Sequence, residues 1–414
     1  MTVPVSQQDS RSTWLIASKL FAPEEVPGPV GVLHSAGRIL AIRRDLGPAE
    51  LTAGTDVVDL RPWSLAPGYI DLHTHGFRGH DVTSGSEADI VDMARALPST
   101  GVTAFYPTIA STGPLETQRQ VRRIAQAIAD LRPAGAEILG IRLEGPYISR
   151  RRRGAQYEPA IRPPDPEELE ALASQGPISM VDFAPEEDAD ARLLLAMSRL
   201  GIIPSIGHTD ATYAQAIAAI DAGARHCTHL FNAMPPFEHR SPGVVGALLT
   251  DGRPTIEIIA DGIHVHPAML RLAVAVCAAR HVALVTDAMP ATGQADGQYL
   301  FLEREIVVKD GSARMADGTL AGSVLTLDRG VRNMVELAGV ACTDAIRMAT
   351  LTPARVAGVA RCKGRLRPGA DADLVALDDT GTIQQTWIGG QCVFAASNAG
   401  GTPYANTDYG LEAS

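Results

Sequence analysis

The stretch APGYIDLHTHG, Ala66 to Gly76, organises the chain. A Pro-Gly turn leads into it, the apolar run Tyr69 to Leu72 is typical of a β-strand, and His73 and His75 follow directly. Because residues i and i+2 of a strand point to the same face, both imidazoles should project together from the strand end. Such a pair could supply half of a tetrahedral zinc-type site. An H-x-H pair can equally be two core or surface histidines, so further ligands at the same place must decide.

Composition limits the classes of protein to consider. With 414 residues, 45% of them hydrophobic, the chain is long enough for one large domain and a smaller companion. The 36 basic and 47 acidic residues give a net charge of -11, which argues against nucleic-acid or anionic-membrane partners. The N-terminus does not resemble a signal peptide, no apolar run approaches a membrane span, and the five cysteines have no paired spacing. We therefore expect a cytoplasmic protein with reduced thiols.

Both ends of the chain contain short strand-like pieces separated by Pro and Gly. They suggest one small β domain formed by residues 14–64 and 362–396, with the long middle, 65–361, inserted between them. Residues 1–13 are expected to be a disordered N-terminus and 397–414 a C-terminal tail. The strand-like pieces are Trp14 to Ala17, Gly31 to His34, Arg38 to Arg43, Asp56 to Asp59, part of Gly364 to Leu377, and Thr386 to Val393.

The middle of the chain alternates apolar strand candidates with helical segments. Such alternation over more than 200 residues predicts an α/β fold, a TIM-like (β/α)8 barrel. A doubly wound open sheet is the alternative, but no G-x-G-x-x-G follows the first strand. The eight strand candidates are Pro67 to Leu72, Gly101 to Pro107, Ile138 to Leu143, Ile178 to Phe183, Ile202 to Ile206, Arg225 to Leu230, Thr255 to Ile259 and Val282 to Thr286.

Chemistry-bearing residues follow the ends of these strands. Active sites of such barrels lie at the carboxyl ends of the strands, whereas chance would scatter histidines over the whole fold. The coincidence favours a metal site over structural histidines. The residues are His73, His75, Glu144, His208, His229, His264 and Asp287.

The motifs PGYIDLHTHG, LEGPY, GHTDAT, THLFNAM, ADGIHV, TDAM and LAGS resemble those of the N-acetylglucosamine-6-phosphate deacetylases of the amidohydrolase superfamily. The resemblance extends from about Trp14 to Val393 and keeps the motif order. It implies a metal-bearing barrel, a β-sandwich built from both chain ends, a homodimer, and a small-molecule sugar phosphate as substrate.

The resemblance also implies the ligand set. Glu144, His208 and His229 match the principal metal ligands, and His73 with His75 matches the additional pair of members that hold a second metal. We therefore expect one or two divalent ions per subunit. Zinc is the first expectation, with iron, manganese, cobalt or nickel as alternatives, because nitrogen and oxygen ligands accept several metals.

Asp287 is predicted to be the catalytic base. A metal lowers the pKa of bound water, and a nearby carboxylate can take its proton and hand it to the leaving amine. Asp287 could instead cap the following helix. His264 resembles the family histidine that contacts the substrate and polarises its carbonyl. The implied products are D-glucosamine 6-phosphate and acetate.

Substrate binding is implied for a further set of positions. Arg240 matches an arginine that reaches the phosphate across the dimer interface, since a guanidinium grips phosphate bidentately. Without the resemblance, it would be an ordinary loop charge. His226, His239 and His266 are expected not to be ligands. The predicted substrate-binding residues are Asn232, Ala233, Arg240, His264, Ala155, Leu320 and Gly322.

The run Arg150 to Arg153 has two interpretations, a solvated mobile face or a lid that steers phosphate inward. Gly154, Ala155 and Gln156 follow, where the family often has Gly-Ala-His. The functional alternatives are the galactosamine epimer as substrate, another amidohydrolase acting on a small N-acyl substrate, and a catalytically inactive scaffold. Intact ligands speak against the last.

Overall fold

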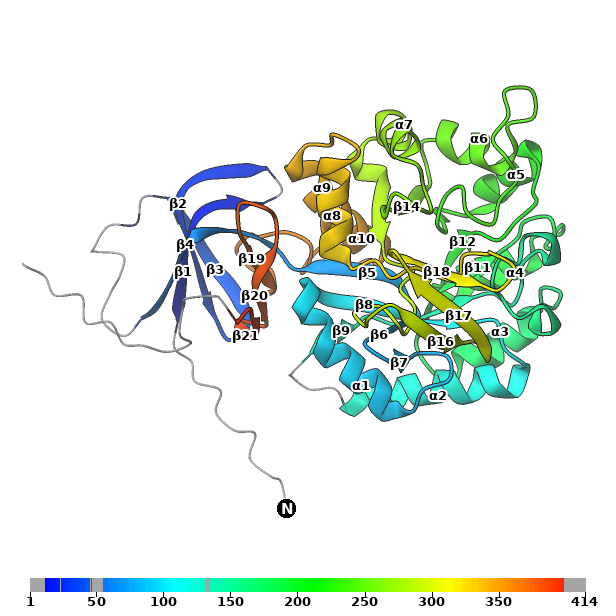
Figure 1. Ribbon diagram of the computed structural model, residues 1–414, viewed down its shortest axis with the longest axis horizontal. Coiled ribbons are helices and arrows are strands. Elements are labelled where there is room, and N and C mark those ends of the chain that lie inside the picture. Colours follow the sequence, from blue (N-terminus) through cyan, green and yellow to red (C-terminus); the bar gives the residue numbers. More distant parts are fainter. Residues whose placement is uncertain (1–11, 23, 45, 47–54, 131–134, 398–414) are drawn as a thin grey trace, which may run out of the picture.

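The computed structural model describes residues 12–22, 24–44, 46, 55–130 and 135–397. It has two parts, which stand side by side in Figure 1: a sheet of strands from both chain ends, and a barrel surrounded by helices. The predicted N-terminal and C-terminal tails lie almost entirely outside the described residues. Among those that are described, no helix combines the length and apolar character needed to cross a bilayer.

Eight parallel strands form the barrel, each followed along the chain by a helix. The sheet runs in the order β15-β14-β13-β12-β11-β10-β8-β5. The ends of this path meet where His73 O accepts from Asp287 N at 2.8 Å and the Asp71 carboxylate accepts from Thr286 Oγ1 at 2.6 Å. The predicted barrel is confirmed. Its strands are β5 (Tyr69–Thr74), β8 (Val102–Ala110), β10 (Ile141–Glu144), β11 (Ile178–Phe183), β12 (Ile203–Ile206), β13 (His226–Cys227), β14 (Thr255–Ile259) and β15 (Val282–Val285).

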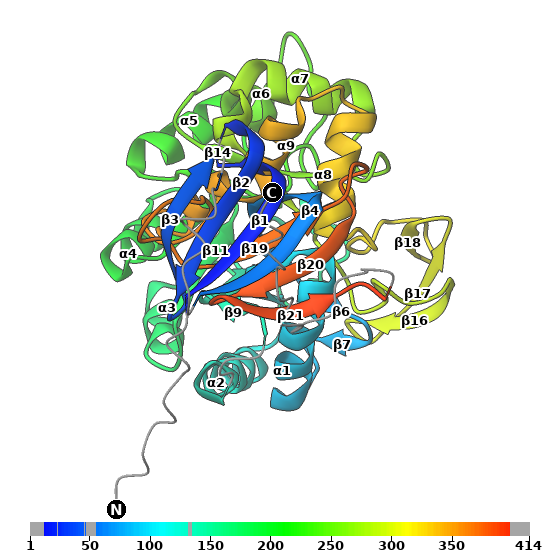
Figure 2. The ribbon, with the colours of Figure 1, turned by 90° about the vertical axis from the view of Figure 1, so that its left-hand side faces the viewer.

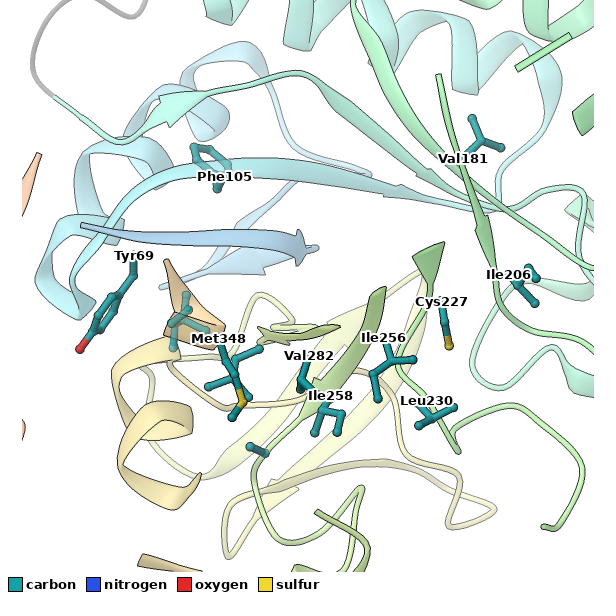
Figure 3. Packing of buried hydrophobic residues seen from close by; sticks show 14 of the residues in the cluster. Tyr69, Phe105, Val181, Ile206, Cys227, Leu230, Ile256, Ile258, Val282 and Met348 are labelled. Atoms are coloured by element: carbon teal, nitrogen blue, oxygen red, sulfur yellow. The ribbon is translucent and has the colours of Figure 1, made fainter. Parts of the chain in front are cut away.

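Helices cover the outside of the barrel and bury apolar side chains against the strands. Figure 3 shows part of this layer, with Phe105 on β8, Val181 on β11, Ile206 on β12 and Ile256 on β14. Helix α1 begins at a capping box in which Ser86 and Asp89 satisfy each other's backbone N–H groups. The helices are α1 (Glu87–Ala96), α2 (Pro114–Asp130), α3 (Pro166–Ala173), α4 (Arg192–Leu200), α5 (Tyr213–Ala222), α6 (Gly243–Thr250), α7 (Pro267–Cys277), α8 (Leu327–Glu336), α9 (Cys342–Ala349) and α10 (Leu351–Val356).

The chain ends build one seven-stranded sheet in the order β21-β20-β19-β4-β1-β2-β3. Figure 2 shows this sheet face-on, with the blue N-terminal strands beside the orange C-terminal ones. The junction between the two ends is the antiparallel pair of β19 and β4, in which Leu374 lies opposite Pro67. The strands are β1 (Thr13–Phe21), β2 (Glu25–Ser35), β3 (Arg38–Arg44), β4 (Asp56–Pro67), β19 (Leu374–Leu377), β20 (Ile383–Ile388) and β21 (Gln391–Ala395).

A buried lysine ties the two parts together. Lys363 Nζ lies 2.6 Å from Asp373 Oδ2, 3.0 Å from Asp371 Oδ2 and 2.7 Å from Glu137 Oε2. Glu137 belongs to β9 (Glu137–Ile138), which pairs with barrel strand β8. The chain-end sheet is therefore anchored to the barrel through one ammonium group with three carboxylate partners.

A second antiparallel sheet was not predicted. Strands β16 (Gly297–Phe301), β17 (Arg304–Lys309) and β18 (Ser312–Met315) lie between β15 and α8, in front of the barrel in Figure 1. They pack on their own apolar cluster, which includes Phe301, Ile306 and Ala313. A short hairpin of β6 (Gly76–Phe77) and β7 (His80–Asp81) follows the H-x-H pair.

Candidate metal centre

The predicted ligands meet at the carboxyl end of the barrel. His73 lies on β5 and His75 directly follows it, Glu144 ends β10, and His208, His229 and Asp287 follow β12, β13 and β15; all six side chains are buried. His208, His229 and Asp287 have positive φ angles of 47°, 25° and 49°. Non-glycine residues rarely adopt this conformation, and it concentrates at functional sites.

The first ligand set, which we call the outer half, consists of Glu144, His208 and His229. Glu144 Oε1 lies 3.0 Å from Nε2 of His208 and 3.1 Å from Nε2 of His229. The two Nε2 atoms are themselves 3.1 Å apart. One carboxylate oxygen and two imidazole nitrogens therefore surround one point.

The second set, which we call the inner half, consists of His73, His75 and Asp287, with Glu144 shared between both. Glu144 Oε2 lies 3.1 Å from His75 Nε2, and Asp287 Oδ1 lies 3.3 Å from the same nitrogen. His73 Nε2 is 3.2 Å from His75 Nε2. In each set the candidate ligand atoms lie within 4.8 Å of one another.

Charge dominates the protonation of this cluster. Burial alone would raise the pKa of Glu144, but the neighbouring His73, His208 and His75 hold it well below its usual range. Burial opposes protonation of His75, yet Glu144 and Asp287 outweigh it and raise the pKa of His75 to about 9. Burial also opposes ionisation of Asp287, but His73 and His75 lower its pKa. The carboxylates are therefore ionised, and a positive charge must lie beside them to balance their negative charge.

The ring orientations suit a cation. His208 Nδ1 lies 2.9 Å from the carbonyl of Arg152, and His75 Nδ1 lies 3.0 Å from the carbonyl of Thr108. A carbonyl oxygen only accepts hydrogen bonds, so each Nδ1 carries a proton. The Nε2 edge of each ring then faces the cluster. Two Nε2 atoms about 3 Å apart would oppose their lone pairs unless a proton or a metal cation lies between them. This donor set fits a zinc-type divalent ion.

The centre opens into a cavity of about 340 Å³. Its walls include most of the predicted site, together with Phe301 and Leu302 of the unpredicted sheet. His73 lies beneath the wall and is fully buried. Arg240 is exposed and does not belong to the lining, in which Arg314 is the one arginine or lysine among the described residues. The predicted residues that line the cavity are His75, Glu144, Ala155, His208, His229, Asn232, Ala233, His264, Asp287, Leu320 and Gly322.

The histidines excluded from the ligand set lie elsewhere. His226, inside the barrel, has Nδ1 3.0 Å from Ser205 Oγ, and burial lowers its pKa to about 4. The His266 side chain accepts from Ala268 N at the start of α7. His239 is exposed. None belongs to either half of the centre.

Gln156 contacts the centre in a way the sequence analysis missed. Its amide nitrogen donates to Glu144 Oε2, and its side-chain oxygen accepts from Ser111 N at 2.7 Å. The side chain is buried and lines the cavity. The residue that departs from the Gly-Ala-His pattern is therefore one that orients the shared carboxylate.

Asp287 is held by neighbours on both sides. Ser323 N donates to the Asp287 carbonyl at 2.7 Å, which places the end of the LAGS motif against it. Gly322 has φ +60°, and a Cβ there would lie 2.9 Å from the same carbonyl. Asp71, another unpredicted residue, accepts from Thr286 Oγ1, and burial raises its pKa to about 6.

The arginine run is connected to the outer half. Arg150 to Arg152 form a short 3-10 turn whose last carbonyl is the partner of His208. Arg152 Nε in turn donates to Asp210 Oδ1 at 2.7 Å, while the Arg151 side chain is 84% exposed. One arginine of the run therefore supports the centre from outside.

The geometry can now be compared with known proteins. The sequence pattern of the amidohydrolase family matches residues 64–393, which contain the whole barrel and every ligand above. The chain belongs to the amidohydrolase family. This amidohydrolase is 42% identical over 330 residues to the N-acetylgalactosamine-6-phosphate deacetylase of Escherichia coli O157:H7, covering 79% of this chain and 87% of the relative. It is 38% identical over 346 residues to the N-acetylglucosamine-6-phosphate deacetylase of Bacillus subtilis, covering 81% and 86%.

Solved structures agree with the sequence relatives. The N-acetyl-D-glucosamine-6-phosphate deacetylase from Mycobacterium smegmatis, in a mutant form with N-acetyl-D-glucosamine-6-phosphate, superposes with a TM-score of 0.86. It is 34% identical, and the match covers 93% of this amidohydrolase and 100% of that chain. The resemblance predicted from the motifs is thus confirmed at the level of family and fold.

Proposed function

We propose that this chain hydrolyses the acetamide of N-acetyl-D-glucosamine 6-phosphate to D-glucosamine 6-phosphate and acetate. One observation carries the proposal: Asp287 and two buried ligand sets converge on a cavity in a chain that is 38% identical to a deacetylase of this substrate. The intact ligand sets speak against an inactive scaffold.

The residues would divide the work as follows. A divalent ion held by the two halves would act as a Lewis acid and lower the pKa of a water molecule. Asp287, whose pKa is lowered by His73 and His75 against the effect of burial, is ready to take a proton from the water that attacks the acetamide carbon. As the C–N bond breaks, Asp287 returns this proton to the leaving nitrogen. Acetate and the free amine result.

His264 is proposed to orient the substrate carbonyl. Its Nδ1 lies 2.6 Å from Asp261 Oδ2, which fixes the ring and leaves Nε2 for the cavity that His264 lines. The ring held in this way presents its Nε2 edge to a substrate carbonyl in the cavity.

Three finer assignments belong to the same proposal. Zinc is the first choice because the donors are imidazole nitrogens and carboxylate oxygens. A homodimer would let Arg240, exposed and outside its own chain's cavity, reach a substrate phosphate in the partner. A cytoplasmic location agrees with five free cysteines.

The galactosamine epimer is the second candidate. The 42% identity to an N-acetylgalactosamine-6-phosphate deacetylase favours it, whereas the 38% and 34% identities to glucosamine-type enzymes favour the first. The epimers differ at one hydroxyl, so the metal centre and Asp287 would serve either.

The experiment is acetate release from the two N-acetylamino-sugar 6-phosphates and from unphosphorylated N-acetylglucosamine, with zinc-loaded protein. We expect the highest kcat/KM for the glucosamine phosphate. Preference for the galactosamine phosphate would establish the second candidate. No release from any of the three by metal-bound protein would contradict the proposal.

A further inference from the structure

A layer of charged side chains lies inside the barrel, directly beneath the metal centre. Arg142 on β10, Asp182 on β11 and Glu257 on β14 are all 0% exposed. Each lies inside the barrel on a strand of mostly buried residues, where an unpaired charge would cost several kcal/mol. Buried charges need oppositely charged or hydrogen-bonding partners. For these three side chains, most of the partners belong to the layer itself.

Arg142 is the hub of this layer. Its guanidinium donates to Asp182 Oδ1 at 3.0 Å, to Glu257 Oε2 at 3.1 Å and to the Leu72 carbonyl at 2.9 Å. One positive charge thus faces two carboxylates. Either carboxylate alone would suffice to neutralise it, so the second one calls for another explanation.

Glu257 differs from Asp182 because it also contacts the metal centre. Its Oε2 lies 3.3 Å from Nδ1 of His73 and accepts from the backbone N–H of His229 at 3.2 Å. His73 belongs to the inner half and His229 to the outer half. The Asp182 carboxylate accepts from Arg142 and, among the described residues, from no metal ligand.

We propose that Glu257 is a positioning residue of the metal centre. It holds the His73 ring with the proton on Nδ1 and Nε2 turned to the ion, and it fixes the backbone from which His229 projects. Arg142 keeps Glu257 ionised and in place for this task. A carboxylate behind a ligating imidazole orients the ring and makes it a better ligand. Glu257 does not contact the cavity, and the inference depends on the proposed function only for the presence of a divalent ion.

The chain offers a matched pair of variants. Both oxygens of Glu257 accept hydrogen bonds. In Glu257→Gln the amide NH2 group would therefore face a hydrogen-bond donor in either orientation of the side chain. Glu257→Gln leaves Arg142 paired with Asp182, and Asp182→Asn leaves it paired with Glu257. The two variants therefore change buried charge equally, in the same layer, and only Glu257→Gln disturbs a metal ligand.

The test is a zinc titration of metal-free wild-type protein and both variants by chelator competition, with bound zinc counted by mass spectrometry. We expect Glu257→Gln to weaken the ion held by His73 and His75 by about 10- to 100-fold, the range for partners of ligating histidines. Asp182→Asn should change it by less than ~3-fold. Equal affinities in Glu257→Gln and wild type would overturn the inference, as would equal losses in both variants.

A second measurement observes the His73 ring directly in the wild-type protein. In zinc-loaded wild-type protein with 15N-labelled histidine, His73 should show a slowly exchanging Nδ1–H signal, identified by its loss in His73→Asn. Zinc bound with His73 in the opposite ring orientation would overturn the inference but leave the proposed function standing. Failure of wild-type protein to bind any divalent ion would overturn both.

Discussion

The two halves of the metal centre are built from different parts of the fold. In the outer half, His208 Nδ1 meets the carbonyl of Arg152, which belongs to a partly exposed arginine run. In the inner half, His73 and His75 are fixed through Glu257 and the Thr108 carbonyl, both on barrel strands. One half therefore depends on a loop near solvent and the other on the charged barrel interior. Substitutions in the loop should change the metal affinity of the outer half and leave that of the inner half unchanged.

Substitution of Glu144, the residue shared by both halves, should have the largest effect. Glu144 supplies one oxygen to each half, so Glu144→Gln removes negative charge from both. We expect both ions to bind more weakly and turnover to fall by ~1,000-fold or more, because the ion contributes several kcal/mol to catalysis. Metal analysis and acetate release measure the two effects. A variant with a normal ion content would show that Glu144 is not a shared ligand.

Asp287→Asn should separate chemistry from metal binding. The variant keeps Glu144 and the ligand histidines but loses the proton acceptor, so turnover should fall by about 100- to 10,000-fold while the ion of the outer half stays bound. Acetate release with parallel metal analysis gives both numbers. Near-normal turnover would refute the role of Asp287 as the base.

The inner half should release protons when it takes up an ion. In metal-free protein the pKa of His75 is about 9, so His75 is protonated at pH 7 and an incoming ion must displace that proton. We expect about one proton to be released from His75 at pH 7, and this release to vanish as the pH rises above 9. Calorimetry in buffers of different ionisation enthalpy measures it. A binding enthalpy that is the same in all buffers at pH 7 would show that no proton is released and would contradict the assignment.

The loop support of the outer half should give the smallest effect. Asp210→Asn removes the 2.7 Å pair with Arg152 Nε, whose carbonyl holds His208. The pair is partly exposed and worth up to about 1 kcal/mol, so the outer ion should bind roughly 2- to 5-fold more weakly and the inner ion as before. Asp221→Asn, at another surface pair with Arg253, is the control. Equal weakening of both ions would abolish the distinction between the halves.

The sequence predicted those features that short local patterns of residues encode, namely the barrel strands and the metal ligands. Apolar runs ending in His, Glu or Asp identified the barrel strands and the ligands together, because the carboxyl ends of barrel strands carry the chemistry. The sheet formed by β16, β17 and β18 was overlooked although REIVVK contains the β-branched run Ile306 to Val308, which is typical of strands.

The layer beneath the centre also left a signal in the sequence. Arg142, Asp182 and Glu257 are charges inside apolar strands, a pattern that indicates buried pairs. Their partners could not be predicted, because strand register around a barrel decides which of them meet. The contact of Gln156 with Glu144 depends on the course of a loop and had no local signal.

We infer that this barrel end is a metal-dependent deacetylase site. The most direct measurement is acetate release from N-acetylglucosamine 6-phosphate by protein stripped with a chelator and then titrated with zinc. The account predicts no turnover in the stripped protein and recovery that saturates at one or two ions per chain. Full turnover in protein shown to be free of metal would contradict it.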